Sequence, residues 1–256
     1  MHTDIARLVD LTGRVALITG GSRGLGRAMA LGFAKAGASV VVASRKVDAC
    51  GEVVAEISAL GGQGLAAAVR MQEPDEVHAL VEAAVARFGR LDIVVNNAAT
   101  VLDRTLEALT PDTFRGAFDT NLLGPMLLVQ AAAPHLAAGG VGSIINISSI
   151  AAVRATPTRY LYPPVKSAML QVTRSLAVHL APQGIRVNAI MPGTFRTDMV
   201  EKAYTAEQLA GTARMTPLGR VAETDEIVGP ALFLASDMAS FVTGTVLTVD
   251  GGYLLV

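Results

Sequence analysis

Tyr162 and Lys166 are two side chains that can exchange protons, and they stand four residues apart. Positions i and i+4 lie on one face of a helix, so the ammonium group of Lys166 is expected beside the phenol of Tyr162. A free tyrosine has a pKa of about 10, which is too high for efficient proton exchange near neutral pH. A neighbouring positive charge favours the phenolate and lowers that pKa. Alone, the pair is more typical of an exposed helix surface, so its interpretation depends on the rest of the chain.

A glycine-rich turn near the N-terminus has the residue types that bind a diphosphate. It reads Thr19-Gly20-Gly21-Ser22-Arg23-Gly24-Leu25-Gly26 and lies between a short apolar run and a segment of helical period. Gly20 can adopt a positive φ, Gly24 lets the backbone approach a diphosphate, and Gly26 lets the helix pack on the strand. The following helix offers free N–H groups and the positive end of its dipole. Because this pattern joins a strand to a helix, it predicts a dinucleotide site rather than a turn without a ligand.

The end of the second apolar run bears on which dinucleotide binds. It reads Ser44-Arg45, where an NAD enzyme usually has an acidic residue that binds the ribose hydroxyls. Arg45 and Arg23 could together bind a 2′-phosphate through charge-assisted hydrogen bonds. The alternative is that both are solvated surface arginines. We predict that NADP(H) is preferred and that NAD(H) is possible.

Seven short apolar runs alternate with longer segments of helical period. The expected strands are Val15–Thr19, Val40–Ala43, Leu65–Val69, Leu91–Asn96, Ser143–Ser148, Ile185–Ile190 and Thr245–Val249. Strands that are apolar throughout are buried on both faces, and helices between them imply parallel crossovers. The prediction is an α/β, doubly wound Rossmann fold of three layers with seven mostly parallel strands. Residues 1–256 are expected to form one domain, in which about 194–222 lacks a clear period.

The composition is that of a globular protein, with 51% hydrophobic and 17% charged residues. A net charge of −1 gives no basic field for nucleic acid or for an anionic membrane surface, and no membrane span is expected. Cys50 is the only cysteine, and the four histidines are scattered without the spacing of metal ligands, so no metal site is expected. The expected location is cytoplasmic.

Further motifs follow in order along the chain. They are Asn96-Asn97-Ala98-Ala99, Asn121, Ser148-Ser149, Tyr162-Pro163-Pro164-Val165-Lys166, Pro192-Gly193 with Thr197, and Asp250-Gly251-Gly252. Together with the glycine turn, they resemble the short-chain dehydrogenase/reductase family, from about Leu11 to the C-terminus. The resemblance is to the subgroup with a Tyr-x-x-x-Lys motif, which includes 3-oxoacyl reductases and gluconate and glucose dehydrogenases.

The resemblance implies a catalytic set of Asn121, Ser149, Tyr162 and Lys166. Ser149 matches the family's serine because it precedes Tyr162 by thirteen positions, whereas Tyr160 is excluded because Pro164 stands where the lysine would be. Tyr162 would be the general acid and base in hydride transfer between nicotinamide and a carbonyl or alcohol, and Ser149 would bind the substrate oxygen. Lys166 would also bind the nicotinamide ribose. The implied cofactor-binding set is Gly20, Ser22, Arg23, Gly24, Leu25, Gly26, Ser44, Arg45, Met71, Asn97, Ala98, Tyr162, Lys166, Pro192, Gly193, Phe195 and Thr197.

Asn121 lies four residues before Pro125 in a long expected helix that begins at Pro111. Proline has no N–H, so the carbonyl of Asn121 loses its usual helical partner and the helix should kink there. In the family, this carbonyl holds a water molecule of a proton relay to the lysine.

The sequence departs from the family pattern at four places. Ala99 replaces a glycine. Arg70 replaces an aspartate that contacts adenine, so adenine recognition would depend on the backbone around Met71; alternatively, Arg70 stacks or points outward. Pro163-Pro164 constrains Tyr162, so we expect the helix to begin near Pro164. Phe195 opens the region from about 194 to 222, which in the family is a lid over the substrate. Its apolar Met199, Tyr204 and Met215 fit either a hydrophobic substrate or packing onto the core.

Three alternative functions fit the sequence less well. A nucleotide-sensing protein with a weak active site is supported only by the double proline, and a methyltransferase would favour an acidic residue where Ser44-Arg45 stands. An enoyl reductase would space its tyrosine and lysine more widely. The expected partners are a small carbonyl or alcohol substrate and further copies of the chain. The resemblance implies a homo-oligomer, a tetramer or a dimer, formed through the helices that begin near Pro111 and Tyr162.

Overall fold

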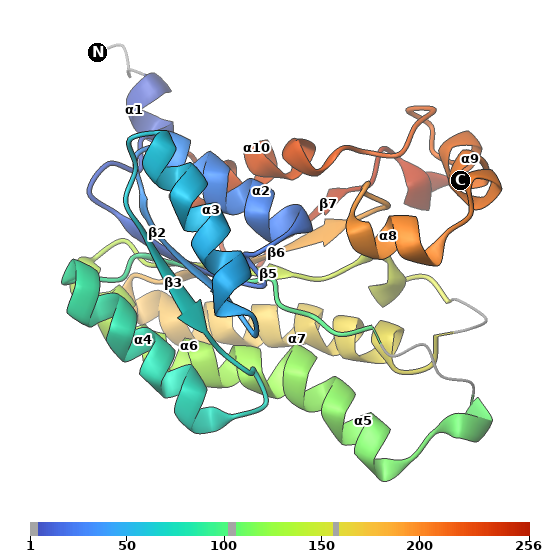
Figure 1. Cartoon of the computed structure of the whole chain (residues 1–256), viewed down its shortest axis with the longest axis horizontal. Coiled ribbons are helices and arrows are strands. Elements are labelled where there is room, and N and C mark those ends of the chain that lie inside the picture. The colour runs from blue at the N-terminus through green and yellow to red at the C-terminus, as the bar shows by residue number, and fades with distance from the viewer. Residues whose placement is uncertain (1–4, 102–105, 156–158) are drawn as a thin grey trace.

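The computed structural model describes residues 5–101, 106–155 and 159–256, which form one sheet covered by helices (Figure 1). The strands are β1 (Val15–Thr19), β2 (Ser39–Ser44), β3 (Gly64–Ala68), β4 (Ile93–Asn96), β5 (Ser143–Ile147), β6 (Arg186–Pro192) and β7 (Val246–Val249). They lie in the order β3-β2-β1-β4-β5-β6-β7, and every pairing is parallel. The expected doubly wound Rossmann fold with three layers is confirmed.

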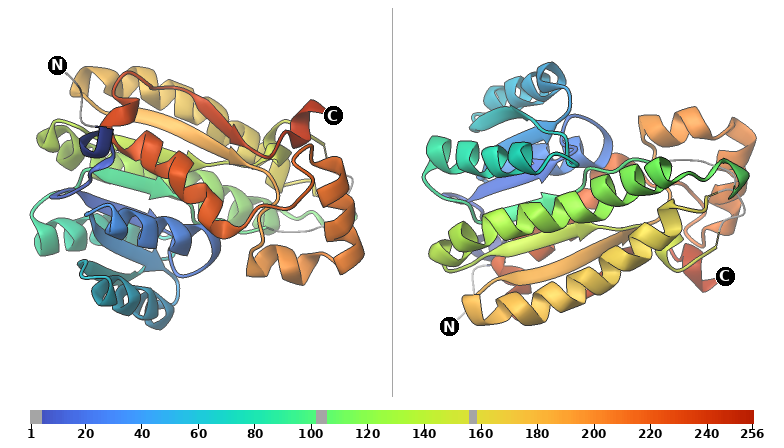
Figure 2. Two further views of the ribbon diagram at one scale, coloured as in Figure 1. Left: turned by 90° about the horizontal axis from the view of Figure 1, so that it is seen from above. Right: turned by 90° about the horizontal axis from the view of Figure 1, so that it is seen from below.

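Helices cover both faces of the sheet, as the views from above and below show (Figure 2). On one face lie α2 (Gly24–Lys35), α3 (Val47–Ala59) and α10 (Val228–Ala235), and on the other lie α4 (Pro74–Phe88), α6 (Gly124–Gly139) and α7 (Tyr162–Leu180). Each face has its own hydrophobic cluster, because β1, β2, β4 and β5 are apolar on both sides. The remaining helices are α1 (Ile5–Val9), α5 (Pro111–Phe118), α8 (Asp198–Ala203) and α9 (Ala206–Met215).

The structure differs from the sequence-based expectation at three places along the chain. The segment from about 194 to 222, which lacks a clear period, contains α8 and α9. The long helix from Pro111 is divided into α5, a π turn at Asp119–Leu123 and α6. α7 begins at Tyr162 rather than near Pro164, because both prolines fit in the first helical turn, where no N–H partner is needed.

By length and composition, the stretch Pro111–Gly139 could cross a membrane, which the sequence analysis did not expect. In this fold, its residues Leu128, Ala132 and Leu136 are fully buried against the sheet. The apolar composition is therefore that of a helix with one face in the core and with Leu123 and Met126 exposed on the other.

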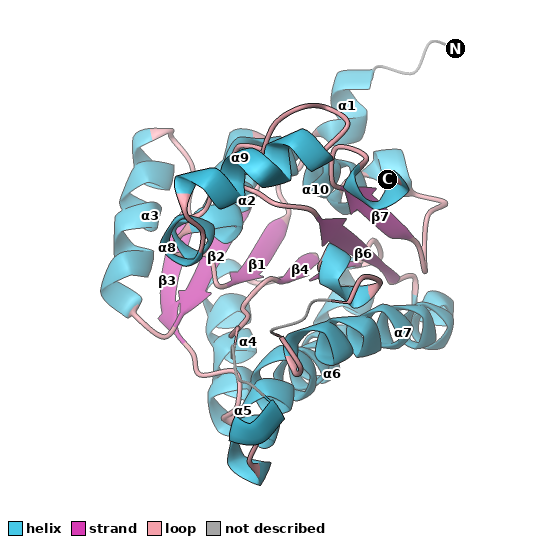
Figure 3. Ribbon diagram, turned by 90° about the vertical axis from the view of Figure 1, so that its right-hand side faces the viewer, coloured by secondary structure: helices cyan, strands magenta, loops and turns pink. Residues whose placement is uncertain are grey.

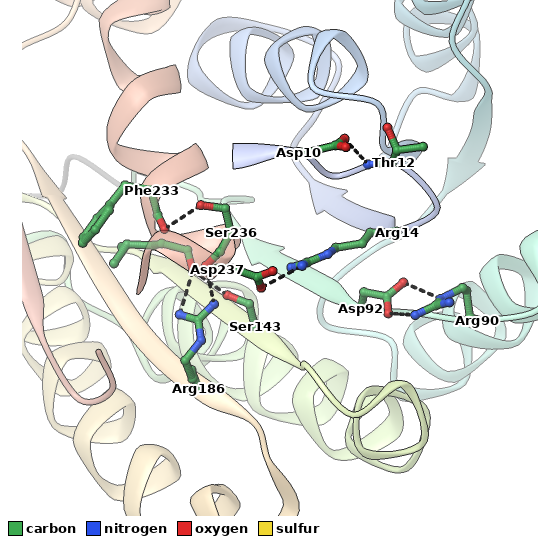
Figure 4. Close-up of polar contacts among 11 residues, drawn as sticks. Asp10, Thr12, Arg14, Arg90, Asp92, Ser143, Arg186, Phe233, Ser236 and Asp237 are labelled. Carbon is green, nitrogen blue, oxygen red and sulfur yellow. Dashed lines mark hydrogen bonds and ion pairs between the residues drawn. The ribbon is translucent and has the colours of Figure 1, made fainter. Parts of the chain in front are cut away.

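The amino ends of the strands are joined by a polar network (Figure 4). Arg186, at the start of β6, donates to the carbonyls of Leu234 and Ser236 at 2.8 and 3.2 Å. Arg14, which precedes β1, forms an ion pair with Asp237 at 2.7 Å. The fully buried Asp92 accepts the N–H of Val15 at 2.8 Å and a guanidinium N–H of Arg90 at 2.6 Å. These contacts fix the edge of the sheet that lies opposite α8 and α9.

Asp92→Ala is expected to lower the free energy of unfolding by about 2 kcal/mol, because it leaves the buried N–H of Val15 without an acceptor. Urea unfolding followed by circular dichroism measures the change. Asp112→Ala is the matched control, since Asp112 pairs with Arg115 on an exposed surface and little change is expected. Equal stability of the two variants would contradict the structural role of Asp92.

Candidate active site

The glycine turn between β1 and α2 has the shape of a phosphate cradle. Gly20 and Gly24 have positive φ values of 64° and 54°. A Cβ atom at Gly26 would lie 2.2 Å from the carbonyl oxygen of Gly20, so only glycine fits there. The N-terminus of α2 has no side-chain cap, and its first N–H groups point out of the carboxyl edge of the sheet. The turn therefore fits a diphosphate.

Two side chains fix this turn to the neighbouring strand. Thr19 donates its hydroxyl to the carbonyl of Val95 at 3.2 Å and accepts the N–H groups of Asn97 and Ala98, both at 3.1 Å. Asn97 donates its side-chain amide to the carbonyls of Thr19 and Gly20 at 2.9 and 3.1 Å. Asn97 was expected near the cofactor, whereas the role of Thr19 was missed. A hydroxyl residue at the end of an otherwise apolar strand is the sequence signal that indicates it.

Two exposed cations lie in the glycine turn and directly after β2. Arg23 and Arg45 are exposed, and neither side chain bonds to another residue in the described part of the chain. The hydroxyl of Ser44 is used within its own turn, where it bonds to the N–H of Lys46 at 3.2 Å and to the thiol of Cys50 at 3.1 Å. The two arginines are thus the groups available to a 2′-phosphate.

Arg70 and Met71 are the two residues on the expected adenine side. Arg70 points outward and binds Glu76, whose carboxylate accepts its backbone N–H at 2.7 Å and its Nε–H at 2.9 Å. Met71 is buried, and its carbonyl oxygen packs against Gly124. A Cβ atom at Gly124 would lie only 2.1 Å from this oxygen. A contact of Met71 with adenine would therefore come from its backbone.

Ser149, Tyr162 and Lys166 meet at the carboxyl edge of β5. Ser149 follows this strand, and its hydroxyl is close enough to the phenol of Tyr162 to lower the pKa of that phenol. Lys166 lies one helical turn after Tyr162, with its Nζ atom 5.6 Å from the centre of the tyrosine ring. The ammonium group donates to the carbonyl of Ile147 at 2.7 Å. The three side chains that the sequence singled out are therefore neighbours.

The protonation of this group differs from the expectation that Lys166 lowers the pKa of Tyr162. Burial raises the pKa of Tyr162, and the hydrogen bond from Ser149 and the charge of Arg159 only partly oppose this effect. Burial also lowers the pKa of Lys166 to about 8. The expectation fails because both groups lie in a low-dielectric site that disfavours their charged forms, and because the ammonium group is turned toward Ile147.

Helix α7 is fixed to β5 by hydrogen bonds that the sequence analysis did not anticipate. The hydroxyl of Ser148 donates to the carbonyl of Lys166 at 3.0 Å. The amide of Asn146 donates to the hydroxyl of Thr173 at 2.9 Å. Thr173 lies seven residues after Lys166 and so on the same face of the helix. Buried polar residues on an apolar strand are the signal for such anchors, which hold Tyr162 and Lys166 in register with Ser149.

Asn121 lies in the π turn between α5 and α6, which packs against α7. Its side chain is buried and accepts the N–H of Thr100 at 3.1 Å while donating to the carbonyl of Ala117 at 2.7 Å. Because the side chain is engaged in these bonds, the backbone carbonyl is the group of Asn121 that can bind a water molecule. The π turn lies directly before Pro125, where the missing N–H of the proline predicts a kink in the helix.

The segment after β6 lies over the glycine turn. Pro192 ends the strand, and the N–H of Gly193 donates to the carbonyl of Val249 at 2.9 Å. A Cβ atom at Gly24 would lie 3.4 Å from the methyl group of Thr197, so Thr197 faces the phosphate cradle. Phe195 is buried in the core, which leaves only its backbone for a cofactor contact. Figure 3 shows α8 and α9 at this end of the sheet.

Known proteins share this arrangement. Residues 20–254 match the family described as Enoyl-(Acyl carrier protein) reductase. An uncharacterized oxidoreductase of Methylorubrum extorquens is 44% identical over 246 residues, which cover 94% of this chain and 98% of that protein. The chain belongs to the short-chain dehydrogenase/reductase family. This membership confirms the resemblance seen in the motifs and shows that the protein is an oxidoreductase, so the sensor alternative is not favoured.

Two solved structures of the family superpose closely on this one. A 7α-hydroxysteroid dehydrogenase complexed with NADH and 7-oxo glycochenodeoxycholic acid is 36% identical, with a TM-score of 0.93 and 98% of each chain covered. A gluconate 5-dehydrogenase from Burkholderia cenocepacia, in complex with NADP and tartrate, is 35% identical, with a TM-score of 0.93 and with 98% of this chain and 99% of that chain covered. These two relatives are bound to different nucleotides and to different ligands. Which nucleotide and which substrate this chain binds therefore depends on its own side chains.

Proposed function

We propose that this dehydrogenase/reductase interconverts a carbonyl and a secondary alcohol with NADP(H), and that Tyr162 is its general acid and base. The observation that supports this most is the convergence of Ser149, Tyr162 and Lys166 beside a phosphate cradle to which Thr197 and Asn97 also belong. When bound, the nicotinamide supplies or accepts the hydride. The catalytic set is Asn121, Ser149, Tyr162 and Lys166.

In the direction of reduction, Tyr162 gives its proton to the substrate oxygen. Burial raises the pKa of its phenol, so the group is protonated at neutral pH and available as a donor. The hydroxyl of Ser149 lies near the phenol, and a substrate oxygen between the two hydroxyls would be held in position by both. Lys166 binds the nicotinamide ribose and returns a proton to Tyr162, which its pKa of about 8 allows. Asn121 would hold a relay water through its carbonyl.

Arg23 and Arg45 support the preference for NADP(H), because two exposed cations flank the cradle without partners in the described residues. A charge-assisted hydrogen bond is worth about 1.5–3 kcal/mol, so Arg23→Ala or Arg45→Ala should each raise the Kd for NADPH by about tenfold or more. The Kd for NADH should stay within about twofold, because NADH lacks the 2′-phosphate. Titration followed by nicotinamide fluorescence measures both constants.

Lys35→Ala is the control for this experiment, since Lys35 is an exposed cation at the far end of α2 and should affect neither nucleotide. Wild-type protein that binds NADH more tightly than NADPH, or arginine variants that lose affinity for both equally, would contradict the proposed preference.

The proposals on the domain, the lid, the location and the assembly rest on the family and on exposed apolar side chains. We propose one domain over 1–256, in which about 194–222 is the lid over a small carbonyl or alcohol substrate, and a cytoplasmic location. The exposed apolar Leu123 and Met126 of the π turn and α6 and Val178 of α7 support contacts with further copies of the chain. A homotetramer, or a dimer, is proposed on that ground. Light scattering that shows only a monomer would contradict it.

A further inference from the structure

The two helices of the lid do not hold it in place. Neither α8 nor α9 has a buried residue, and Met199 and Met215 are exposed. Few apolar contacts mean a low local stability. The position of the lid must therefore be set by its two ends, residues 194–196 and 216–222.

These two ends are joined to each other by the backbone. The N–H of Arg196 donates to the carbonyl of Ala222 at 2.8 Å, and the N–H of Ala222 donates to the carbonyl of Thr194 at 3.2 Å. Phe195, between them, is buried in the core and pairs with Ala222 in a short parallel bridge. The lid thus leaves and rejoins the body of the protein beside this bridge, and its second end is also held by the N–H of Leu218, which donates to the carbonyl of Gly251 at 3.2 Å.

At that place, two arginines bind one acidic turn. Arg196 donates its Nε–H to Glu223 at 3.1 Å, and Arg220 donates both Nη groups to Glu226 at 2.5 and 2.6 Å. Glu226 also accepts the N–H of Glu223 at 2.9 Å, which completes a capping box. Arg220 and this N–H lower the pKa of Glu226 to about 2, so the pair stays charged at the pH of any activity assay. Isolated exposed ion pairs contribute little, whereas bidentate, networked pairs contribute more.

The acidic turn also contacts the phosphate-binding helix. Val228 follows the turn directly, and a Cβ atom at Gly32 of α2 would lie only 2.3 Å from its Cγ1 atom. At the other end of the lid, Thr197, which follows Arg196, faces Gly24 of the cradle. The lid ends therefore contact α2 at two places, directly at Gly24 beside the phosphate cradle and, through Val228, at Gly32 two turns further along the helix.

We propose that Arg196 and Arg220, bound to Glu223 and Glu226, form a clamp that holds both ends of the lid against the phosphate helix and so retains the nucleotide. These four are positioning residues, since they act through Thr197 and α2 rather than by touching the reacting atoms. A cavity of about 140 Å³, lined by Thr216, Leu218, Arg220, Glu226 and Asp250 among others, gives the second end room to move when the clamp opens. The inference rests on the proposed binding of NADP(H).

Release of NADPH tests the clamp. Arg220→Ala and Glu226→Gln should each release NADPH about threefold to tenfold faster than the wild type in a stopped-flow displacement experiment, as expected for loss of a networked bidentate pair. The midpoint of thermal unfolding should change little, because the pair is exposed. Arg214→Ala removes an exposed lid arginine that has no partner in the described residues, and it should release NADPH at the wild-type rate.

Proteolysis of the lid without nucleotide tests the clamp separately from the proposed function. Trypsin should cleave after Lys202 of α8 severalfold faster in Arg220→Ala and Glu226→Gln than in the wild type or in Arg214→Ala. The exchanged pair Arg220→Glu with Glu226→Arg should restore slow cleavage. Wild-type rates of both release and cleavage in the single variants would overturn the clamp. Failure of the wild type to bind NADPH would refute the proposed function, while the cleavage result would still decide on the clamp.

Discussion

Tyr162→Phe is expected to lower kcat by about a thousandfold while leaving the Kd for NADPH unchanged. General acid–base catalysis by a positioned side chain contributes about 10²–10⁴ in rate, and phenylalanine keeps the ring while removing only the proton. The phenol is placed for this role by the hydroxyl of Ser149 and by Lys166 one turn away. Steady-state kinetics with an active carbonyl substrate, together with the fluorescence titration, separate the loss in rate from any loss in binding.

Tyr160→Phe is the matched control for that variant. Tyr160 lies two residues earlier, is 45% exposed and has Pro164 where a lysine would be needed. Its loss should leave kcat within about twofold, since surface substitutions have small effects. If Tyr162→Phe kept more than about a tenth of the activity, another group would have to donate the proton and the proposed mechanism would be wrong.

Lys166→Met should have two opposite effects, a loss of activity and a gain of stability. Loss of the proton return and of the ribose contact should lower kcat/KM by about 10²-fold or more. The ammonium group is completely buried, and its folded-state pKa of about 8 lies below its usual value of 10.5. Protonation therefore favours the unfolded chain, and methionine should raise the free energy of unfolding at pH 7 by about 2–3 kcal/mol. Loss of the bond to Ile147 opposes part of this gain.

The pH dependence of the free energy of unfolding shows whether the buried charge of Lys166 destabilises the folded protein. The penalty from Lys166 is fully present below pH 8 and disappears as the pH rises toward 10.5, so the wild type should gain stability over this range relative to the variant. Chemical unfolding between about pH 7 and 9.5 avoids titration of Tyr162, whose pKa is raised by burial. Lys35→Met, at an exposed site, should show neither effect. A less stable Lys166→Met protein at pH 7 would show that burial does not penalise the charge.

The sequence predicted the fold and the arrangement of the site wherever hydrophobic pattern and residue spacing indicate the same structure that tertiary packing requires. Strands such as β1 and β4 are apolar on both faces, which only a sheet covered on both sides permits. Tyr162 and Lys166 are neighbours because four-residue spacing fixes one helix face. The glycine turn could be assigned because Gly26 has no room for a side chain, a requirement of the local geometry.

The remaining features depend on contacts between distant segments. The protonation of Tyr162 and Lys166 was misjudged because burial is set by the whole fold. Helices α8 and α9 were not predicted because they bury no residue and so leave no apolar period in the sequence. The pairing of Arg196 with Glu223 joins residues 27 positions apart, and no local pattern indicates it.

Transfer of deuterium from NADPH labelled at C4 of the nicotinamide tests the central claim most directly. The purified protein would be incubated with nucleotide deuterated at both C4 positions and a panel of ketones, keto acids and 3-oxoacyl thioesters, and the products analysed by mass spectrometry. The proposed mechanism predicts an alcohol that is one mass unit heavier, formed by the wild type and by Tyr160→Phe but not by Tyr162→Phe. Tight binding of NADPH without transfer of deuterium to any carbonyl in the panel would contradict it.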